Sequence, residues 1–386
     1  MSVFHRGRAD EGSAGRQTQQ AGPKTVPDAE QPGQPAAERQ PVPRDSAPAP
    51  ARGGPTIPPT SQQQAATSGP GLTARTAAAG KGDSSVITPL SAETGYDTPI
   101  ARAARAALVA RTGGGPWPRP DACRIVTIAN QKGGVGKTTT AVNMAACMSL
   151  HGLRVLVVDL DPQGNASTAL DVDHHSGVVS VYNVLVDGQP LSGVIKEAAG
   201  LPRLYCAPAT IDLAGAEIEL VPQVARESRL AKALAGYDYS QLDYIFIDCP
   251  PSLGLLTVNA LVAGAEVLIP IQCEYYALEG LEQLLRTVEL VKSHLNPDLA
   301  ISTILLTMFD ARTRLASQVA DEVRDHFGEI VLETIIPRSV RVSEAPSYGQ
   351  SVITYDPGSS GAVAYLEAAR EMAYRKAPKA PKAARG

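Results

Sequence analysis

The pattern of hydrophobic and polar positions changes near residue 122. From there on, short runs of nearly continuous apolar residues alternate with longer stretches in which apolar residues recur every three or four positions. The first pattern is typical of strands buried on both faces, and the second of helices with one apolar face. Seven segments have the strand pattern: 124–129, 154–159, 204–207, 244–248, 266–271, 301–308 and 333–336.

Helical patterns separate these runs and indicate the fold class. They cover 138–151, 225–234, 255–263, 278–295, 316–327, 340–347 and 361–375. Buried strands that alternate with helices form a mostly parallel, twisted sheet with helices on both faces. The sequence therefore predicts an α/β protein, and ligands of such a protein bind at the carboxyl ends of its strands.

The residues before this pattern differ in composition. Residues 1–120 contain 17 of the 31 prolines, many Ala, Gln and Gly, and few bulky apolar side chains. Such a stretch buries too little surface to offset its conformational entropy. We expect a disordered extension over 1–120, with a short helix near 99–111 as an open alternative. The folded domain is placed at 121–375 and a basic tail at 376–386.

Charge and cysteine content narrow the class of protein. The net charge of −4 gives no global attraction to nucleic acid, so any such site must be a local patch. The five cysteines form no C-x-x-C pair, and no signal peptide or membrane-length apolar run occurs. A reduced, cytoplasmic protein is the simplest interpretation.

The segment 131–139, Gln-Lys-Gly-Gly-Val-Gly-Lys-Thr-Thr, lies between the first predicted strand and the first predicted helix. Its glycines let backbone N–H groups converge on an anion, and the helix N-terminus adds its positive dipole end. Lys137 is placed to reach the β- and γ-phosphates, and the Thr138 hydroxyl to hold Mg²⁺. We predict a P-loop NTPase whose nucleotide site includes Gly133, Gly134, Val135, Gly136, Lys137, Thr138 and Thr139.

Carboxylates stand at two further strand ends. Asp159 and Asp161 follow the second strand, and Asp248 ends the fourth. There they can approach a γ-phosphate and its Mg²⁺. Taken alone, residues 159–165 fit a helix cap with a turn equally well, because Asp-Pro and Gly-Asn are strong turn formers. With the P-loop upstream, a metal site of Thr138, Asp159 and Asp248 is favoured.

The P-loop departs from the common form in one respect. Gln131 stands where the usual motif has its first glycine, and a second lysine, Lys132, opens the loop. Lys-Gly-Gly-x-Gly-Lys-Thr resembles the deviant Walker A motif of the ParA/MinD ATPases. The resemblance implies Mg²⁺-dependent ATP hydrolysis in a homodimer. It assigns catalysis to Lys132, which crosses to the partner subunit's nucleotide, to Lys137, and to Asp161, which positions the attacking water.

The resemblance to the ParA/Soj chromosome-partitioning group extends over residues 123–375. Segments 306–313 and 336–347 look like signature segments of that group. They imply an adenine pocket at Met308 and Pro337.

The same segments imply non-specific binding of double-stranded DNA through Arg312 and Arg341, with Arg314 and Arg338 as neighbours. The group also implies a ParB-like centromere-binding partner that stimulates hydrolysis and thereby releases the dimer from DNA. The expected location is the cytoplasm, on the nucleoid.

Two alternatives stay open. A MinD-like membrane-cycling ATPase needs a C-terminal amphipathic helix with bulky apolar residues. Segment 361–375 offers Val363, Tyr365, Leu366 and Met372 among many alanines, which favours a helix packed on the sheet, and no membrane partner is expected. The second alternative is a DNA-binding regulator that uses ATP only as a switch, and measurable turnover would distinguish it.

Overall fold

The computed structural model describes residues 103, 106–107, 115–275 and 279–377, which fall within the compact unit Ser84–Gly386. Residues 103, 106 and 107 are helical. The rest of the candidate helix near 99–111, most of the expected disordered extension and nearly all of the basic tail lie outside the described residues.

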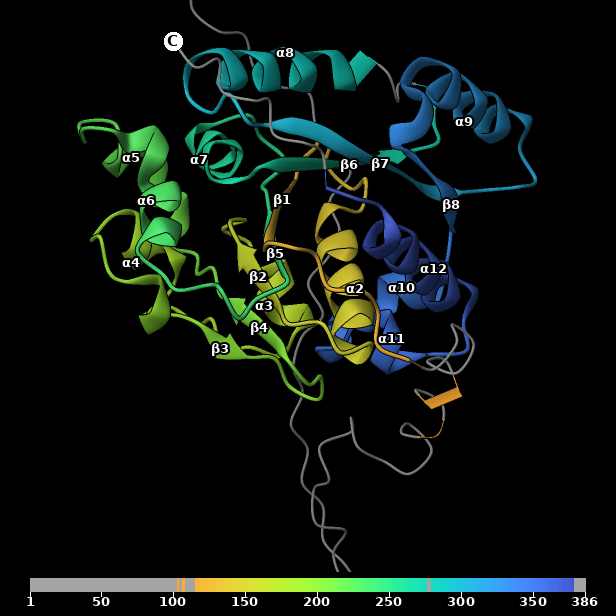
Figure 1. Cartoon of the computed structure of the whole chain (residues 1–386), viewed down its shortest axis with the longest axis horizontal. Coiled ribbons are helices and arrows are strands. Elements are labelled where there is room, and N and C mark those ends of the chain that lie inside the picture. The colour runs from red at the N-terminus through yellow and green to blue at the C-terminus, as the bar shows by residue number, and fades with distance from the viewer. Residues whose placement is uncertain (1–102, 104–105, 108–114, 276–278, 378–386) are drawn as a thin grey trace, which may run out of the picture. The chain divides into compact units, whose positions relative to one another are not determined.

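An eight-stranded sheet forms the centre of the fold, in the order β3-β4-β2-β5-β1-β6-β7-β8 (Figure 1). Its strands are β1 (Arg124–Ile128), β2 (Val155–Asp159), β3 (Lys196–Glu197), β4 (Leu204–Ala207), β5 (Tyr244–Asp248), β6 (Glu266–Gln272), β7 (Ala300–Phe309) and β8 (Val331–Pro337). All pairs are parallel except β3 with β4. The predicted α/β class is confirmed. Among the strands in the described part of the chain, the sequence pattern missed only β3, because two residues show no alternation.

The helices connect these strands. They are α2 (Lys137–Leu150), α3 (Asn165–Ala169), α4 (Val181–Leu185), α5 (Leu213–Glu219), α6 (Arg229–Ala235), α7 (Leu255–Ala263), α8 (Glu279–His294), α9 (Arg314–Phe327), α10 (Val340–Glu344), α11 (Val352–Tyr355) and α12 (Ser360–Tyr374). Four 3₁₀ turns are η1 (Leu191–Gly193), η2 (Arg226–Ser228), η3 (Gly328–Ile330) and η4 (Ala345–Tyr348). Two predicted helices, 225–234 and 340–347, are each divided into an α-helix and a 3₁₀ turn. The short helices α3, α4, α5 and α11 were not predicted.

Each face of the sheet has its own apolar core. Within β2, Leu156 and Val158 belong to the core that also contains side chains of α4, α5, α6, α7, α8 and α9, whereas Val155 and Val157 belong to the core that contains side chains of α2, α11 and α12. Successive side chains of a strand point to opposite faces, so a strand that is apolar throughout supplies both cores. Figure 1 shows α2 and α12 side by side on the second face.

A buried ion pair joins the start of the sheet to its last helix. The Arg124 guanidinium donates twice to Glu266 at 2.7 Å, and its remaining nitrogen reaches the carbonyl oxygens of Met372 and Arg375 at 3.1 Å. Arg124 and Glu266 are 5 % and 3 % exposed. Because Arg124 begins β1 and the P-loop follows the end of β1, this contact lies at the edge of the sheet opposite the P-loop.

Candidate nucleotide and magnesium site

Strand register brings the three sequence motifs together. Ile128, the last residue of β1, pairs with Asp248, and Asp248 pairs with Asp159 on its other side. The P-loop leaves β1 at this level, so it begins beside both carboxylates. The carboxyl edge of three adjacent strands thus carries the P-loop and both acidic motifs, as expected for a parallel sheet.

The P-loop conformation depends on its glycines. Gly134 and Gly136 have φ of +74° and +92°, a region that side chains with a Cβ avoid, and Gly136 is the N-cap of α2. The Thr307 hydroxyl of β7 donates to the Val135 carbonyl at 2.8 Å, which ties the loop to the sheet. This arrangement aims the free N–H groups at the start of α2 at one point, where an anion is favoured.

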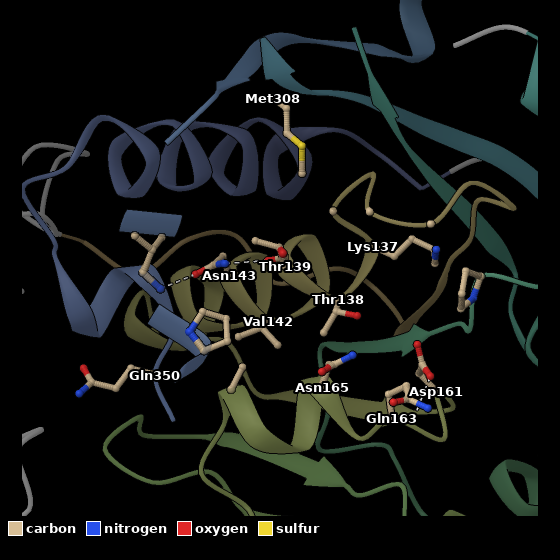
Figure 2. Close-up of a pocket in the computed structure, with 17 residues that line it drawn as sticks. Lys137, Thr138, Thr139, Val142, Asn143, Asp161, Gln163, Asn165, Met308 and Gln350 are labelled. Atoms are coloured by element: carbon tan, nitrogen blue, oxygen red, sulfur yellow. Dashed lines mark hydrogen bonds between the residues drawn. The ribbon is translucent and has the colours of Figure 1, made fainter. Parts of the chain in front are cut away.

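A pocket of about 460 Å³ opens at that point. Figure 2 shows Lys137, Asp161 and Gln163 toward one end and Asn143 and Gln350 toward the other. The residues that line it are Gly133, Gly134, Gly136, Lys137, Thr138, Thr139, Val142, Asn143, Asp161, Gln163, Asn165, Ala169, Pro251, Met308, Pro346, Gln350 and Val352.

Lys137 is the buried cation of this pocket, at 6 % exposure. Its ammonium donates to the Lys132 carbonyl at 3.2 Å. Burial lowers the pKa of Lys137, and the nearby Asp248, Cys249 and Asp161 act in the opposite direction. A buried ammonium with unused donors is a strong site for phosphate oxygens.

Asp159 is fully buried and bound by protein donors. One oxygen accepts from the Asp161 N–H at 3.1 Å, and the other from the Ser167 N–H and hydroxyl at 2.9 and 2.7 Å. Burial raises its pKa to about 6, although these hydrogen bonds favour the charged form. In this structure Asp159 holds Asp161 and α3 in place. Its assignment as a metal ligand stays a prediction.

Asp248 is the unsatisfied group of the site. It is 0 % exposed, and neither carboxylate oxygen has a hydrogen-bond partner of normal geometry among the described residues. Burial and the charge of Asp159 raise its pKa well above the usual range, and the nearby Thr138 hydroxyl lowers it by less. A buried carboxylate without a partner is costly unless a cation or a donor compensates it.

These residues fit a nucleotide-bound magnesium ion. Within the described part of the chain, no cluster of three or more His, Cys, Asp or Glu side chains could hold a metal alone. Magnesium at nucleotide sites takes one or two carboxylates and completes its shell with phosphates and water. The orphaned Asp248 and the Thr138 hydroxyl supply that limited set.

Asp161 is the acidic residue that faces the pocket itself. It is 7 % exposed and lines the end of the pocket at which Lys137 lies (Figure 2). Its Oδ1 accepts from the Gln163 N–H at 3.0 Å, which fixes the carboxylate against the following turn. The two aspartates that are neighbours in the sequence therefore have different environments. The Asp159 side chain is buried and bound by protein donors, whereas the Asp161 side chain lines the pocket.

The Lys132 side chain points away from the pocket. It is not among the pocket-lining residues, and its ammonium lies 3.1 Å from the Glu274 carboxylate, with both side chains partly exposed. The Lys132 N–H donates to the Asn130 side chain at 3.0 Å, which fixes the backbone while the side chain leaves the loop. The two lysines of the motif thus project in different directions.

Met308 and Pro337, the residues expected to contact adenine, line a common cavity but differ in their access to the main pocket. Met308 lines both the main pocket and an adjoining cavity of about 130 Å³, whereas Pro337 lines only the smaller one. Met308 has φ +52°, a strained value for a residue with a Cβ, which often marks a functional position. Their role in adenine binding stays a prediction.

Several pocket residues were missed by sequence reasoning. Asn143 donates to the Thr139 carbonyl at 2.7 Å and accepts from the Val352 N–H at 2.8 Å, so it joins α2 to α11 (Figure 2). Gln350 lies close by. No pattern marks a single amide inside a helix or loop, although Gln163, Asn165 and Pro346 belong to segments that the sequence did single out.

The proposed DNA arginines lie outside the pocket, and each is paired with acids. Arg312 is 86 % exposed and contacts Asp310 at 2.7 and 2.9 Å. Arg312 accordingly lowers the pKa of Asp310 to about 2. Arg341 lies 3.0 Å from Glu344 and 3.4 Å from Asp356.

An AAA domain family model matches residues 123–301. The chain is 57 % identical to the sporulation initiation inhibitor protein Soj of Bacillus subtilis over 250 residues, which are 65 % of this chain and 98 % of Soj. The chain belongs to the ParA/Soj family.

Other relatives agree with this membership. The chromosome partitioning protein ParA of Myxococcus xanthus is 52 % identical over 67 % of this chain and 91 % of its own length. A crystal structure of cobyrinic acid a,c-diamide synthase from Mycobacterium smegmatis, with bound ADP and magnesium, is 40 % identical with a TM-score of 0.56. That match covers 64 % of this chain and 92 % of the other. The family resemblance and the P-loop fold predicted from the motifs are confirmed.

Proposed function

We propose that this chain is a chromosome-partitioning ATPase that cycles between a free form and an ATP-bound homodimer on DNA. ATP is the nucleotide and Mg²⁺ the metal ion, in line with the ADP and magnesium of the similar structure. In this proposal the ATP dimer binds double-stranded DNA without sequence preference, and a ParB-like partner stimulates hydrolysis, which releases the dimer.

The direction of Lys132 carries this proposal. Lys137 lines its own subunit's pocket, but Lys132 projects away from that pocket to Glu274. Ordinary P-loop chemistry needs only Lys137. Lys132 can act on a nucleotide if that nucleotide lies in another subunit. This role agrees with the family to which the chain belongs.

The chain's own residues then divide the chemistry. Lys137 and the P-loop N–H groups bind the phosphates and neutralise charge that develops on their oxygens. Asp161 holds the attacking water in line, and Lys132 of the second subunit adds a positive charge. Thr138 and Asp248 would hold the magnesium ion, which supplies further charge stabilisation to the phosphates when bound.

Arg312 and Arg341 are the proposed phosphate contacts on DNA. Both are exposed by half or more, with side chains 86 % and 55 % exposed, and they follow the strand ends of β7 and β8. Both guanidinium groups pair with carboxylate oxygens in this structure, and the same fork of N–H donors suits the phosphate oxygens of the DNA backbone.

The membrane-cycling alternative finds no support in α12. Tyr365, Leu366 and Met372 are at most 1 % exposed, and the helix packs on α2 and β8. Its apolar side is therefore used inside the fold. No helix in the described ranges is long and apolar enough to span a bilayer.

The test is Lys132→Ala. We expect ATP hydrolysis to fall by about 10³–10⁵, the range for a charge supplied in trans, while ATP still binds through Lys137. Turnover is measured over a range of protein concentrations, with fluorescent-nucleotide binding in parallel. The matched control, Lys232→Ala, removes an exposed lysine of α6 and should leave turnover unchanged. Normal hydrolysis by the Lys132 variant would refute the dimer proposal.

A further inference from the structure

Glu274 connects three strand ends at the rim of the site. It follows β6, its Oε2 lies 3.1 Å from the Lys132 ammonium, and its Oε1 lies 3.9 Å from the Arg338 guanidinium at the end of β8. The Gln272 amide also donates to Oε1. In the proposed function, Lys132 acts on the nucleotide of another subunit. In this structure, Glu274 of the same chain binds it.

The two positions of Lys132 exclude each other. An ammonium that contacts Glu274 in its own chain cannot at the same time contact a phosphate in the facing subunit. Formation of the ATP dimer must therefore break the Lys132–Glu274 pair. Because the two side chains are 34 % and 45 % exposed, water reaches the pair and can separate it.

We propose that Glu274 is a positioning residue that holds Lys132 within its own subunit and so sets the protein concentration at which the ATP dimer forms. This inference rests on the proposed function. Glu274 acts before assembly and does not touch the nucleotide. Once Lys132 has left, Arg338 can close on the same carboxylate, so the acid is not left without a cation.

The size of the effect follows from the exposure of the pair. Exposed ion pairs change an equilibrium by about 1.4- to 5-fold. A symmetric dimer breaks one pair in each subunit, so the factor enters twice. Removal of the Glu274 charge should therefore tighten the dimer by about 2- to 30-fold. A pair of this strength sets a threshold and does not block assembly.

Glu274→Gln tests the inference, because it removes the charge and keeps the shape. Dimer formation is titrated by mass photometry with a non-hydrolysable ATP analogue, and turnover is titrated against protein concentration with ATP. We expect the half-point of both curves to move to lower concentration, with the plateau turnover per subunit unchanged. Glu282→Gln is the matched control, since it removes the acid of the exposed Arg286–Glu282 pair on α8.

The outcomes separate the two proposals. If the unmodified protein forms no ATP dimer, the proposed function fails. If it forms one and the Glu274 variant has the same or a higher half-point, only the inference on Glu274 fails. A lower plateau turnover would place Glu274 in the assembled catalytic site and also overturn the inference. Unfolding is a small concern for so exposed a residue, and a melting curve checks it.

Discussion

The unsatisfied Asp248 should make the nucleotide-free protein less stable than its fold allows. Asp248 is fully buried beside the buried Asp159, and its oxygens have no hydrogen-bond partner among the described residues. Replacement by Asn keeps the size of the side chain and removes the charge. We therefore expect Asp248→Asn to stabilise the free protein while weakening its response to magnesium and ATP.

The magnitude follows from the burial. A buried polar group without a partner costs about 1–3 kcal/mol, and more when charged. Asn still needs partners of its own, so we take the lower value of about 1 kcal/mol as the expected gain. For a domain of this size that corresponds to a rise in Tm of about 2–4 °C. Magnesium and ATP at 100 times Kd should stabilise the unmodified protein by about 2.7 kcal/mol.

The assay is thermal unfolding, with EDTA and with Mg²⁺ and ATP. With EDTA the variant should melt above the unmodified protein, and with Mg²⁺ and ATP the order should reverse. The pH dependence gives a second check. The folded-state pKa of Asp248 is raised, so the native form binds a proton more readily than the unfolded chain, and stability falls as pH rises above the ordinary aspartate value.

This decline should be smaller in the variant, although Asp159, with a pKa of about 6, still contributes to it. Asp321→Asn, at an exposed position on α9, is the control and should not change Tm. A lower Tm for the Asp248 variant in EDTA would refute the reasoning, because it would mean that the carboxylate has partners in the free protein.

Two further predictions concern hydrolysis and DNA. Asp161→Asn keeps the acceptor for the Gln163 N–H but removes the negative charge that holds the attacking water in line. Turnover should fall by about 10²–10⁴, with ATP-dependent DNA binding retained, as phosphate release and filter binding would report. If Arg312 and Arg341 act as proposed, the dimer makes four phosphate contacts, and log K should fall with log[salt] with a slope of about −3.6. Arg312→Ala should halve this slope, whereas Arg286→Ala on α8 should leave it unchanged. An unchanged slope in the Arg312 variant would remove Arg312 from the DNA surface.

The sequence predicted the fold because its strands are apolar throughout. Segments 204–207 and 244–248 coincide with β4 and β5, and 255–263 with α7. The elements that the sequence did not predict, β3, α3, α4, α5 and α11, are all short. Two residues of β3 or four of α11 are too few to establish a period, and such elements form through tertiary contacts.

The site was predictable to the extent that its chemistry is contiguous in sequence. The P-loop, Asp161 and Asp248 are each marked by neighbours along the chain, and the strand register then brings them together. Asn143 and Gln350 could not be found in this way, because only the packing of α11 on α2 makes them neighbours. The inward direction of Asp159 was equally hidden, since it depends on Ser167 eight residues later.

The Arg124 contact has a consequence for how the molecule can be labelled. The Arg124 guanidinium donates to the carbonyl oxygens of Met372 and Arg375. The polypeptide therefore enters and leaves the ATPase fold at one place, at the amino end of β1 and away from the P-loop. In a dimer whose nucleotide edges face each other, these places lie at the two outer poles. Fluorophores attached to side chains there would stay far apart in the assembled pair. Energy-transfer reporters of assembly therefore belong on the rim of the pocket, and bulky affinity tags belong at the poles.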